Sequence, residues 1–443
     1  MSAANPTHYR TLLRLAWRNV QRNWRHSLAT LLTIGIGFCA ISLFDGFLND
    51  LDYKTYDGYS HRGMLGQLVI MKAGTSDGES ADTWASLLGD KEQSFLEDFL
   101  KNDPDVKVRV RFLGLSGIYN HKKQSSYFLG YGFDLADGLA MRGPRWAWNS
   151  LAGRPLDPKE GPAVEIGRGM ASLLGCMPEG PLPLQANGLY KPVERALTCD
   201  RPTLALTTTS ETGQINLMEL PIRAVIDAGS LENDKRALHM PLETAQSLLH
   251  TKKISQVSVE LDPQRVPAFK KRFAQAAKNA GLSFDVIPWW QHPLAQNAKG
   301  GIQILGVFRN LFMFIVAAIG AMAIANSMMK SVSERTREIA TLRSLGFHRR
   351  DIVGLFAFEG LFTCLLACAF GLLVTVALGQ AIAALGITFD AGFLSLPIAL
   401  HVTESPSTWI ISASLLSLLA MTTSFICVRR ASRMRIAEAL RYV

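Results

Sequence analysis

Four long runs of apolar residues constrain the fold of this 443-residue chain more than any other feature. They cover residues 28–48, 311–329, 352–385 and 408–428. A helix needs about 20 apolar residues to cross the hydrocarbon core of a bilayer, and each run is about that long or longer. The run at 352–385 exceeds this length, so we expect that helix to be tilted, kinked or protruding. The pattern predicts an α-helical membrane protein with four transmembrane helices.

Positive charge gathers in three stretches beside these runs. Residues 1–27 hold five arginines and no acidic residue, 330–351 six basic and three acidic residues, and 429–443 five arginines and one glutamate. Basic chains often bind nucleic acid, but basic residues next to apolar runs mark the cytoplasmic side of a membrane. We therefore expect no nucleic-acid partner. Both termini and the 330–351 connector are predicted to be cytoplasmic, and residues 49–300 and 386–407 extracytoplasmic.

The first 27 residues carry arginine at every fourth position, which places one basic stripe on one face of a helix. This pattern predicts an amphipathic helix in the membrane interface, with its arginines toward anionic headgroups. The alternative is a surface helix on a soluble domain, but the apolar run at 28–48 follows at once. That run is too long for a cleavable signal peptide, and no small-residue cleavage site follows it. The stripe consists of Arg10, Arg14, Arg18 and Arg22.

Residues 49–300 contain no run of spanning length. Short stretches rich in β-branched and aromatic residues alternate there with Gly, Pro and short helical patterns, which predicts an α+β domain. We expect two lobes, one built from both ends of this region and one from a central insertion at about 130–220. The insertion holds Cys176 and Cys199, for which an extracytoplasmic compartment permits a disulfide. Two free thiols are the alternative, and we favour the bond.

The connector at 330–351 has a helical pattern. Arg335, Glu338, Leu342 and Leu345 recur at steps of three and four residues, and Gly346 is suited to end the helix as a C-terminal cap. A short amphipathic helix between two transmembrane segments could dock on a soluble protein. The alternative is an ordinary solvated loop that satisfies the positive-inside rule.

These residues resemble a known family. The stretches Glu334–Ile339, Leu342–Gly346 and Arg350–Ile352 are similar to the coupling-helix signature of FtsX-like permeases, the MacB/LolC/LolE type of ABC transporter. Residues 176–202 depart from the family pattern, so the resemblance transfers no substrate identity. Weaker similarity to other family patterns lies in Gly161–Gly167, Met240–Gln246 and Ala431–Arg441.

The resemblance implies an assembly of two permease subunits, as a homodimer or heterodimer in membrane lipid, with two copies of an ATP-binding subunit. ATP and Mg²⁺ would bind to that partner, and this chain would bind no cofactor. ATP-driven closure of the partner would move the coupling helices, and helical stalks would carry the motion to the extracytoplasmic domain. The residues that would couple to the ATPase are Glu334, Arg335, Arg337, Glu338, Leu342, Arg343, Leu345 and Gly346.

Three functions are compatible with this resemblance, all in a bacterial inner membrane with the large domain in the periplasm. The favoured one extracts lipoprotein, lipid or a similar hydrophobic substrate for a periplasmic carrier. The second is MacB-like efflux of peptides or small molecules with an adaptor. The third is FtsX-like activation of a cell-wall hydrolase without transport.

The sequence offers no catalytic or metal-binding motif. It lacks the G-x-x-x-x-G-K-[ST] loop that cradles nucleotide phosphates, and it lacks H-E-x-x-H and paired C-x-x-C motifs. We therefore expect no enzyme activity in this chain, and no catalytic or metal-ligating residue is predicted.

Three ionisable residues lie within or at the ends of the apolar runs. Glu359 stands about two turns into the third run, where a carboxylate needs a partner, and the resemblance suggests a contact with the coupling helix. Asp45 and Arg309 lie near the outer ends of the first and second runs. They could pair with each other where substrate enters laterally. The simpler interpretation is that both reach separately to the interface.

Overall fold

The computed structural model describes residues 6–22, 24–75, 84–121, 124–178, 194–229, 231–389 and 398–431. The chain divides into two compact units, which are described separately below. The helical unit comprises Met1–Leu51, Gly301–Ile387 and Leu400–Val443. The α/β unit comprises Asp52–Gly300 and Thr388–Ala399.

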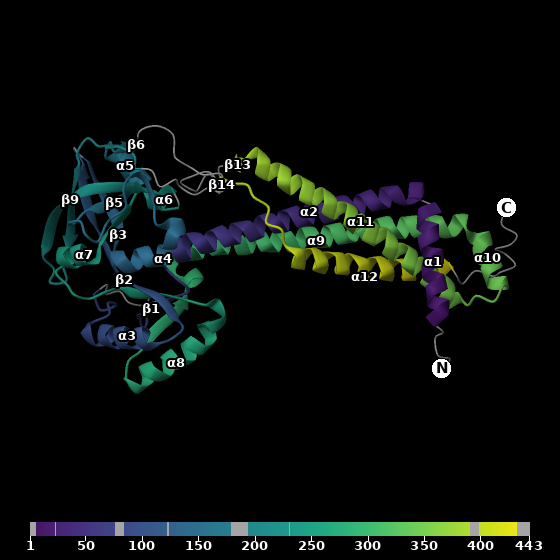
Figure 1. Cartoon of the computed structure of the whole chain (residues 1–443), viewed down its shortest axis with the longest axis horizontal. Coiled ribbons are helices and arrows are strands. Elements are labelled where there is room, and N and C mark those ends of the chain that lie inside the picture. The colour runs from purple at the N-terminus through teal and green to yellow at the C-terminus, as the bar shows by residue number, and fades with distance from the viewer. Residues whose placement is uncertain are drawn as a thin grey trace. The chain divides into compact units, whose positions relative to one another are not determined.

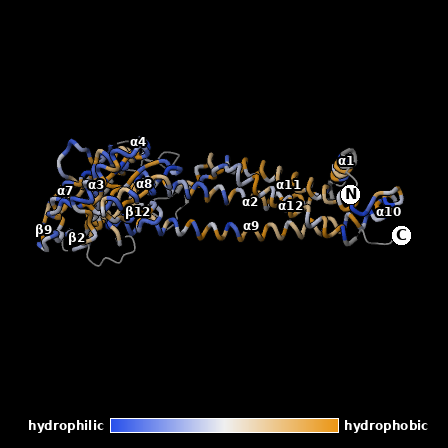
Figure 2. Tube along the Cα trace, turned by 90° about the horizontal axis from the view of Figure 1, so that it is seen from below, coloured by the Kyte–Doolittle hydropathy of each residue, from blue (hydrophilic) through white to orange (hydrophobic). Residues whose placement is uncertain are grey.

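Within the described residues, four helices are long and apolar enough to cross a membrane, so the chain is a multi-pass membrane protein. They are α2 (Trp24–Asp57), α9 (Pro293–Glu334), α11 (Arg349–Leu385) and α12 (Pro406–Ala431). In Figure 2 their apolar stretches appear in orange. With 42 residues, α9 is about 63 Å long, roughly twice the thickness of the hydrocarbon core. The described part of this unit also contains the shorter helices α1 (Pro6–Arg22) and α10 (Thr336–Ser344).

The helices extend beyond the apolar runs that predict them. The first run ends at residue 48, but α2 continues to Asp57, and α9 begins at Pro293, well before the second run. Polar residues with adequate helix propensity continue a helix after its apolar stretch has ended. Hydropathy therefore located the spans but not the helix ends.

Glycines allow close packing inside the helical unit. A Cβ on Gly371 of α11 would lie 2.5 Å from the carbonyl oxygen of Gly35 in α2. A Cβ on Gly360 would lie 2.3 Å from the Ser424 hydroxyl in α12. Small residues let membrane helices approach closely and gain van der Waals contact, which replaces the hydrophobic driving force that lipid removes. Cys364 and Cys368 are buried in the same core and fill space there.

The helix α1 crosses the end of the helical bundle instead of running along it (Figure 1). Leu12 and Ala16 are buried with Leu355 of α11, and Trp17 packs edge-on against Phe362 at 5.6 Å. The arginines of the predicted stripe are exposed on the other side. This arrangement is the amphipathic helix that the arginine spacing predicts.

A ten-stranded mixed sheet organises the α/β unit. Its order is β12-β1-β11-β2-β3-β10-β5-β9-β4, and β8 pairs with both β2 and β9. Strands β2, β3, β10, β5, β9 and β8 therefore form a closed ring of pairs around an apolar core. The strands are β1 (Leu68–Lys72), β2 (Val106–His121), β3 (Gln124–Phe133), β4 (Ser150–Gly153), β5 (Val164–Gly167), β8 (Thr203–Thr209), β9 (Ile215–Ile226), β10 (Ala237–Pro241), β11 (Gln256–Leu261) and β12 (Phe284–Pro288).

Helices and short strands complete this unit. The strand pairs β6 (Met177–Pro178) with β7 (Leu197–Thr198), and β13 (Thr388–Phe389) with β14 (Ile398–Ala399), lie outside the main sheet. The helices are α3 (Asp90–Asn102), α4 (Leu135–Trp146), α5 (Arg168–Leu173), α6 (Leu231–Asp234), α7 (Leu242–Leu249) and α8 (Val266–Asn279), with the short turns η1 (Gly58–Arg62), η2 (Pro263–Arg265) and η3 (Trp289–Gln291).

Four membrane-capable helices and a large α/β unit agree with the predicted fold class. The strands that we predicted to form two lobes belong to one sheet. Strands β12, β1 and β11 lie at one end of its strand order, and β5, β9 and β4 lie at the other. Part of the predicted 386–407 loop, Thr388–Ala399, belongs to the α/β unit. The family-like closing motif at 431–441 lies outside the described residues, apart from Ala431.

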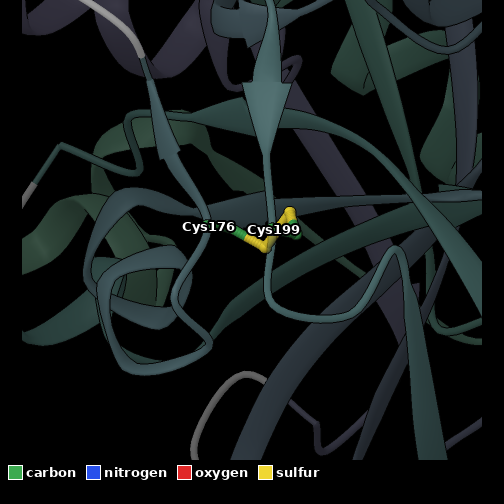
Figure 3. Close-up of a disulfide and its surroundings, with 2 residues drawn as sticks. All are labelled: Cys176 and Cys199. Atoms are coloured by element: carbon green, nitrogen blue, oxygen red, sulfur yellow. A yellow bond between two sulfur atoms is a disulfide. The ribbon is translucent and has the colours of Figure 1, made fainter.

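A disulfide joins Cys176, after α5, to Cys199, after β7 (Figure 3). Cys176 is fully buried in the core of the α/β unit, and Cys199 packs against that core. The bond encloses a loop with a sequence separation of 23. It is the pairing favoured from the sequence.

Reduction of this bond should lower the melting temperature of the full chain in detergent. A loop of this length contributes about 3 kcal/mol in the chain-entropy model, which corresponds to a shift of about 6–12 °C for a unit of this size. The double variant Cys176→Ser/Cys199→Ser should melt at the lowered temperature whether or not a phosphine reductant is present. An unchanged melting temperature, with both thiols open to alkylation before reduction, would contradict the bond.

His292 is buried just before α9 and holds the first turn of that helix. Its Nε2 lies 2.9 Å from the side-chain oxygen of Gln256, and its Nδ1 accepts a 3.3 Å hydrogen bond from the Leu294 amide. The neutral ring satisfies both contacts, with Nε2 as donor and Nδ1 as acceptor. Burial lowers the pKa of His292 from 6.5 to about 4.

The unfolding free energy should therefore depend on pH through His292. Below pH 6.5 His292 binds a proton in the unfolded chain, whereas in the folded chain it stays neutral down to about pH 4. The contribution of neutral His292 to the unfolding free energy is therefore fully present above pH 6.5. It falls by about 3 kcal/mol as the pH drops to 4. Thermal melts between pH 8 and about 4 should show this slope in the native chain and a flatter one in His292→Gln. Equal slopes would show that another group titrates.

Candidate functional site

The connector between α9 and α11 folds into the short helix α10, bounded by two breaks. The backbone leaves helical geometry at Arg335, with φ −109° and ψ 19°. At the other end, Gly346 has φ +97°, a conformation that favours glycine. Its amide donates to the Arg343 carbonyl at 3.2 Å, and the Phe347 amide donates to the Leu342 carbonyl at 3.1 Å. These two bonds form a Schellman cap, the role predicted for Gly346.

Opposite faces of the connector have different surroundings. Ala340 is buried, and Ile339 and Leu342 pack against the core of the helical unit. The outward side carries charged residues and one large apolar side chain, Leu345, which is 72% exposed. The exposed predicted residues are Glu334, Arg337, Glu338, Leu345 and Gly346.

Arg335 lies at the centre of a charged network. Its Nε donates to Glu338 at 2.8 Å, and its Nη1 lies 3.3 Å from the carboxylate of Glu359 in α11. Its guanidinium also covers the ring of Phe356 at 5.5 Å. The side chains of Arg335 and Glu359 are only 11% and 5% exposed. The contact suggested for Glu359 is thus an ion pair with the residue that precedes α10.

The same network reaches α1. Arg22 donates to Glu338 at 3.0 Å, and Asn19 hydrogen-bonds to Glu359. Hydrogen bonds from Arg335 and then from Arg22, together with their charges, lower the pKa of Glu338. The exposed pair between Arg22 and Glu338 adds little stability by itself, but it ties α1 to the connector. The geometry therefore joins α1, α10 and α11.

Sequence reasoning did not identify Asn19, Arg22 and Phe356 as members of this site. One signal was available, because Arg22 is the last member of the arginine stripe and sits at the end of α1. No pattern within the sequence indicated that it meets Glu338, 316 residues away.

A second charged contact lies elsewhere in the helical unit. Arg309 of α9 donates to Asp45 of α2 at 2.8 Å, and Asn49 donates to the other carboxylate oxygen at 3.1 Å. Asp45 is 2% exposed. The two residues are paired, so the simpler interpretation, in which each reaches separately to the interface, does not describe this structure. Removal of either partner would leave the other charge in this buried pair uncompensated.

Among the residues that the structure describes, no three His, Cys, Asp or Glu side chains lie close enough to hold a metal ion.

Loss of Arg335 should destabilise the helical unit. Arg335→Ala leaves Glu359 buried without its cation, which costs about 3–5 kcal/mol. The double variant Arg335→Met/Glu359→Leu removes both charges and should recover most of that loss. Thermal melts of the full chain in detergent measure both effects. Arg349→Ala, at an exposed position, is the control, and an Arg335→Ala melt equal to this control would contradict the role of the pair.

Comparison with protein families places the connector in a known domain. Residues 310–436 match the model described as FtsX-like permease C-terminal. The match includes the connector, α11 and α12, and it confirms the resemblance predicted from the sequence.

Curated relatives agree with this match. The chain is 30% identical over 95 residues to the "Macrolide export ATP-binding/permease protein MacB 1" of Yersinia pestis bv. Antiqua (strain Antiqua), which covers 21% of this chain and 15% of the relative. It is 24% identical over 159 residues to MacB of Acinetobacter baylyi, with 34% and 23% covered. The chain thus spans less than a quarter of the length of these relatives.

Two solved structures are similar to part of the chain. One is the periplasmic region of MacB from Actinobacillus actinomycetemcomitans, at 12% identity and a TM-score of 0.34, with 56% of this chain and 98% of that one covered. The other is the extracellular domain of the ABC-type transporter YknZ from Gram-positive bacteria, at 13% identity and a TM-score of 0.31, with 50% and 98% covered.

Proposed function

We propose that this chain, which carries an FtsX-like permease C-terminal domain in residues 310–436, is the permease subunit of an ABC transporter. The observation that carries the proposal is the connector. Its outward side is exposed and charged, while Arg335 ties its base to α11 and Glu338 ties it to α1. A partner that pushes on this segment would displace membrane helices and not merely a loop.

The ATP-binding partner docks on the outward side of α10 in this proposal. Leu345 supplies an apolar contact, and Glu334, Arg337 and Arg343 supply charged ones around it. Leu342 supports the helix from inside, because it packs against the helical core. Force reaches α11 through Arg335 and Glu359.

In this proposal ATP and Mg²⁺ bind to the ATP-binding partner. Two permease subunits, identical or different, pair with two ATP-binding subunits. The connector and both termini face the cytoplasm of a bacterial cell. The α/β unit works in the periplasm, where its disulfide is stable.

The work performed is the extraction or expulsion of a hydrophobic substrate on the periplasmic side. Extraction of a lipoprotein or lipid for a carrier protein is the first candidate. Export of small molecules or peptides with an adaptor is the second, and the names of the relatives, which describe macrolide export, favour it.

Purification of the full chain from native membranes tests these proposals. An ATP-binding subunit in equal ratio is expected, and its absence would contradict them. Bound lipid or lipoprotein favours the first candidate, and a bound small molecule favours the second.

Charge reversal on the connector should uncouple ATP hydrolysis from transport. Glu334→Lys/Glu338→Lys places positive charge where the partner meets acidic groups, and it also breaks the contacts of Glu338 with Arg335 and Arg22. Substrate release driven by ATP should fall at least about tenfold, with expression intact. The measurement is ATP-dependent release from the purified complex.

The matched control is Glu243→Lys, an exposed glutamate in α7 of the α/β unit. It should release substrate like the native chain. Native release by the connector variant would argue against this docking site.

A further inference from the structure

The end of α2 is fastened into the α/β unit by an unusual turn. After Asp57 the helix widens into η1, a π-helical turn from Gly58 to Arg62. Single π turns often mark functional positions in helices, because they re-aim side chains that a regular helix would direct elsewhere. Here the residues at the two ends of the turn, Asp57 and Arg62, are both largely buried and charged.

The Arg62 guanidinium donates three hydrogen bonds to residues at the ends of two neighbouring strands. Its Nε donates to Asn149 at 2.6 Å, while Nη1 and Nη2 donate to the carboxylate and the carbonyl oxygen of Asp227 at 2.9 and 2.8 Å. Asn149 precedes β4 and Asp227 follows β9, and these strands pair through Ser150 and Ile226. A planar guanidinium with several charge-assisted bonds fixes orientation as well as distance.

Asp57 makes the complementary set of contacts. It accepts hydrogen bonds from the Trp146 indole at 2.9 Å and from His61 at 3.0 Å, and it lies 3.2 Å from Arg145. The Trp146 ring also lies beneath the Arg62 guanidinium at 5.1 Å. Trp146 and Arg145 belong to α4, so the turn is held from the helix side as well as from the sheet side.

The other long helix shared by the two units enters the α/β unit differently. Near its start, α9 is held by His292 and by an ion pair between Lys299 and Asp52. It then has two adjacent glycines, Gly300 and Gly301, where the division into units falls. A Cβ added at either would meet no described atom within 4 Å. Adjacent glycines make a helix easier to bend, whereas α2 crosses the same division without one.

We propose that Asp57, Arg62 and their partners form a clamp that passes displacement of α2 directly to the paired ends of β4 and β9. Arg62 is a positioning residue in this proposal, which rests on the proposed function. Strand β9 then runs without interruption to Ile215, and its far half presents Ile215 and Leu217 at 78% and 64% exposure. Motion that enters at Asp227 thus reaches an exposed apolar part of the sheet along one strand.

The test compares hydrogen exchange of the full chain in nanodiscs, purified with its ATP-binding subunit, with and without ATP and vanadate. The native complex should show a nucleotide-dependent change in the amides of Ser150–Gly153 and Ile222–Ile226. In Arg62→Ala this change should be lost, while the ATP-binding subunit still co-purifies and hydrolyses ATP. Exchange at η1 should rise at least about tenfold, because its buried anchor is gone.

A second variant separates positioning from folding. Arg62→Lys keeps the positive charge beside Asp227 but cannot make the three bonds together. It should retain a near-native melting temperature and still lose the nucleotide-dependent change. Arg272→Ala is the matched control, because it breaks an arginine contact with Asp103 and Asp105 in the same unit away from the clamp.

Each outcome is decisive. A native response in Arg62→Lys, or loss of the response in Arg272→Ala as well, would overturn the clamp while the proposed function stands. Failure of any ATP-binding subunit to co-purify with the native chain would instead overturn the proposed function itself.

Discussion

The ion pair between Arg335 and Glu359 is the constraint on which the helical unit depends. A carboxylate among membrane helices is costly unless a cation meets it. Glu359 is nearly enclosed, and the cation comes from the residue at which α9 gives way to α10. The connector therefore cannot leave α11 without exposing a buried charge to an apolar environment. This makes the short connector a structural part of the helical bundle, and it explains why a solvated loop is a poor description of it.

Much of this arrangement could be predicted from local patterns. Apolar runs located the four long helices, arginine spacing identified the exposed face of α1, and one glycine after an amphipathic stretch located the cap at Gly346. These features depend on residues close together in sequence. The helix ends at Asp57 and Pro293 were missed, because nothing in hydropathy distinguishes a stalk from a loop.

Contacts between distant segments were harder to infer. The sequence showed that Glu359 needed a partner but did not reveal Asn19, and it left Asp45 and Arg309 as either paired or separate. The π turn at Gly58–Arg62 has no sequence signature, and its position depends on Asn149 and Asp227, which contribute only once the sheet has formed. The pairing of β8 with both β2 and β9 joined the strands that had been expected in separate lobes.

The disulfide between Cys176 and Cys199 has a consequence for how the protein matures. In the proposed orientation the α/β unit lies in an oxidising compartment, and the bond forms there because cytosolic reductants keep thiols reduced. A copy inserted with the opposite orientation would retain two free thiols and a looser α/β unit. Under that proposal, insertion in the correct orientation is recorded as a covalent link between Cys176 and Cys199.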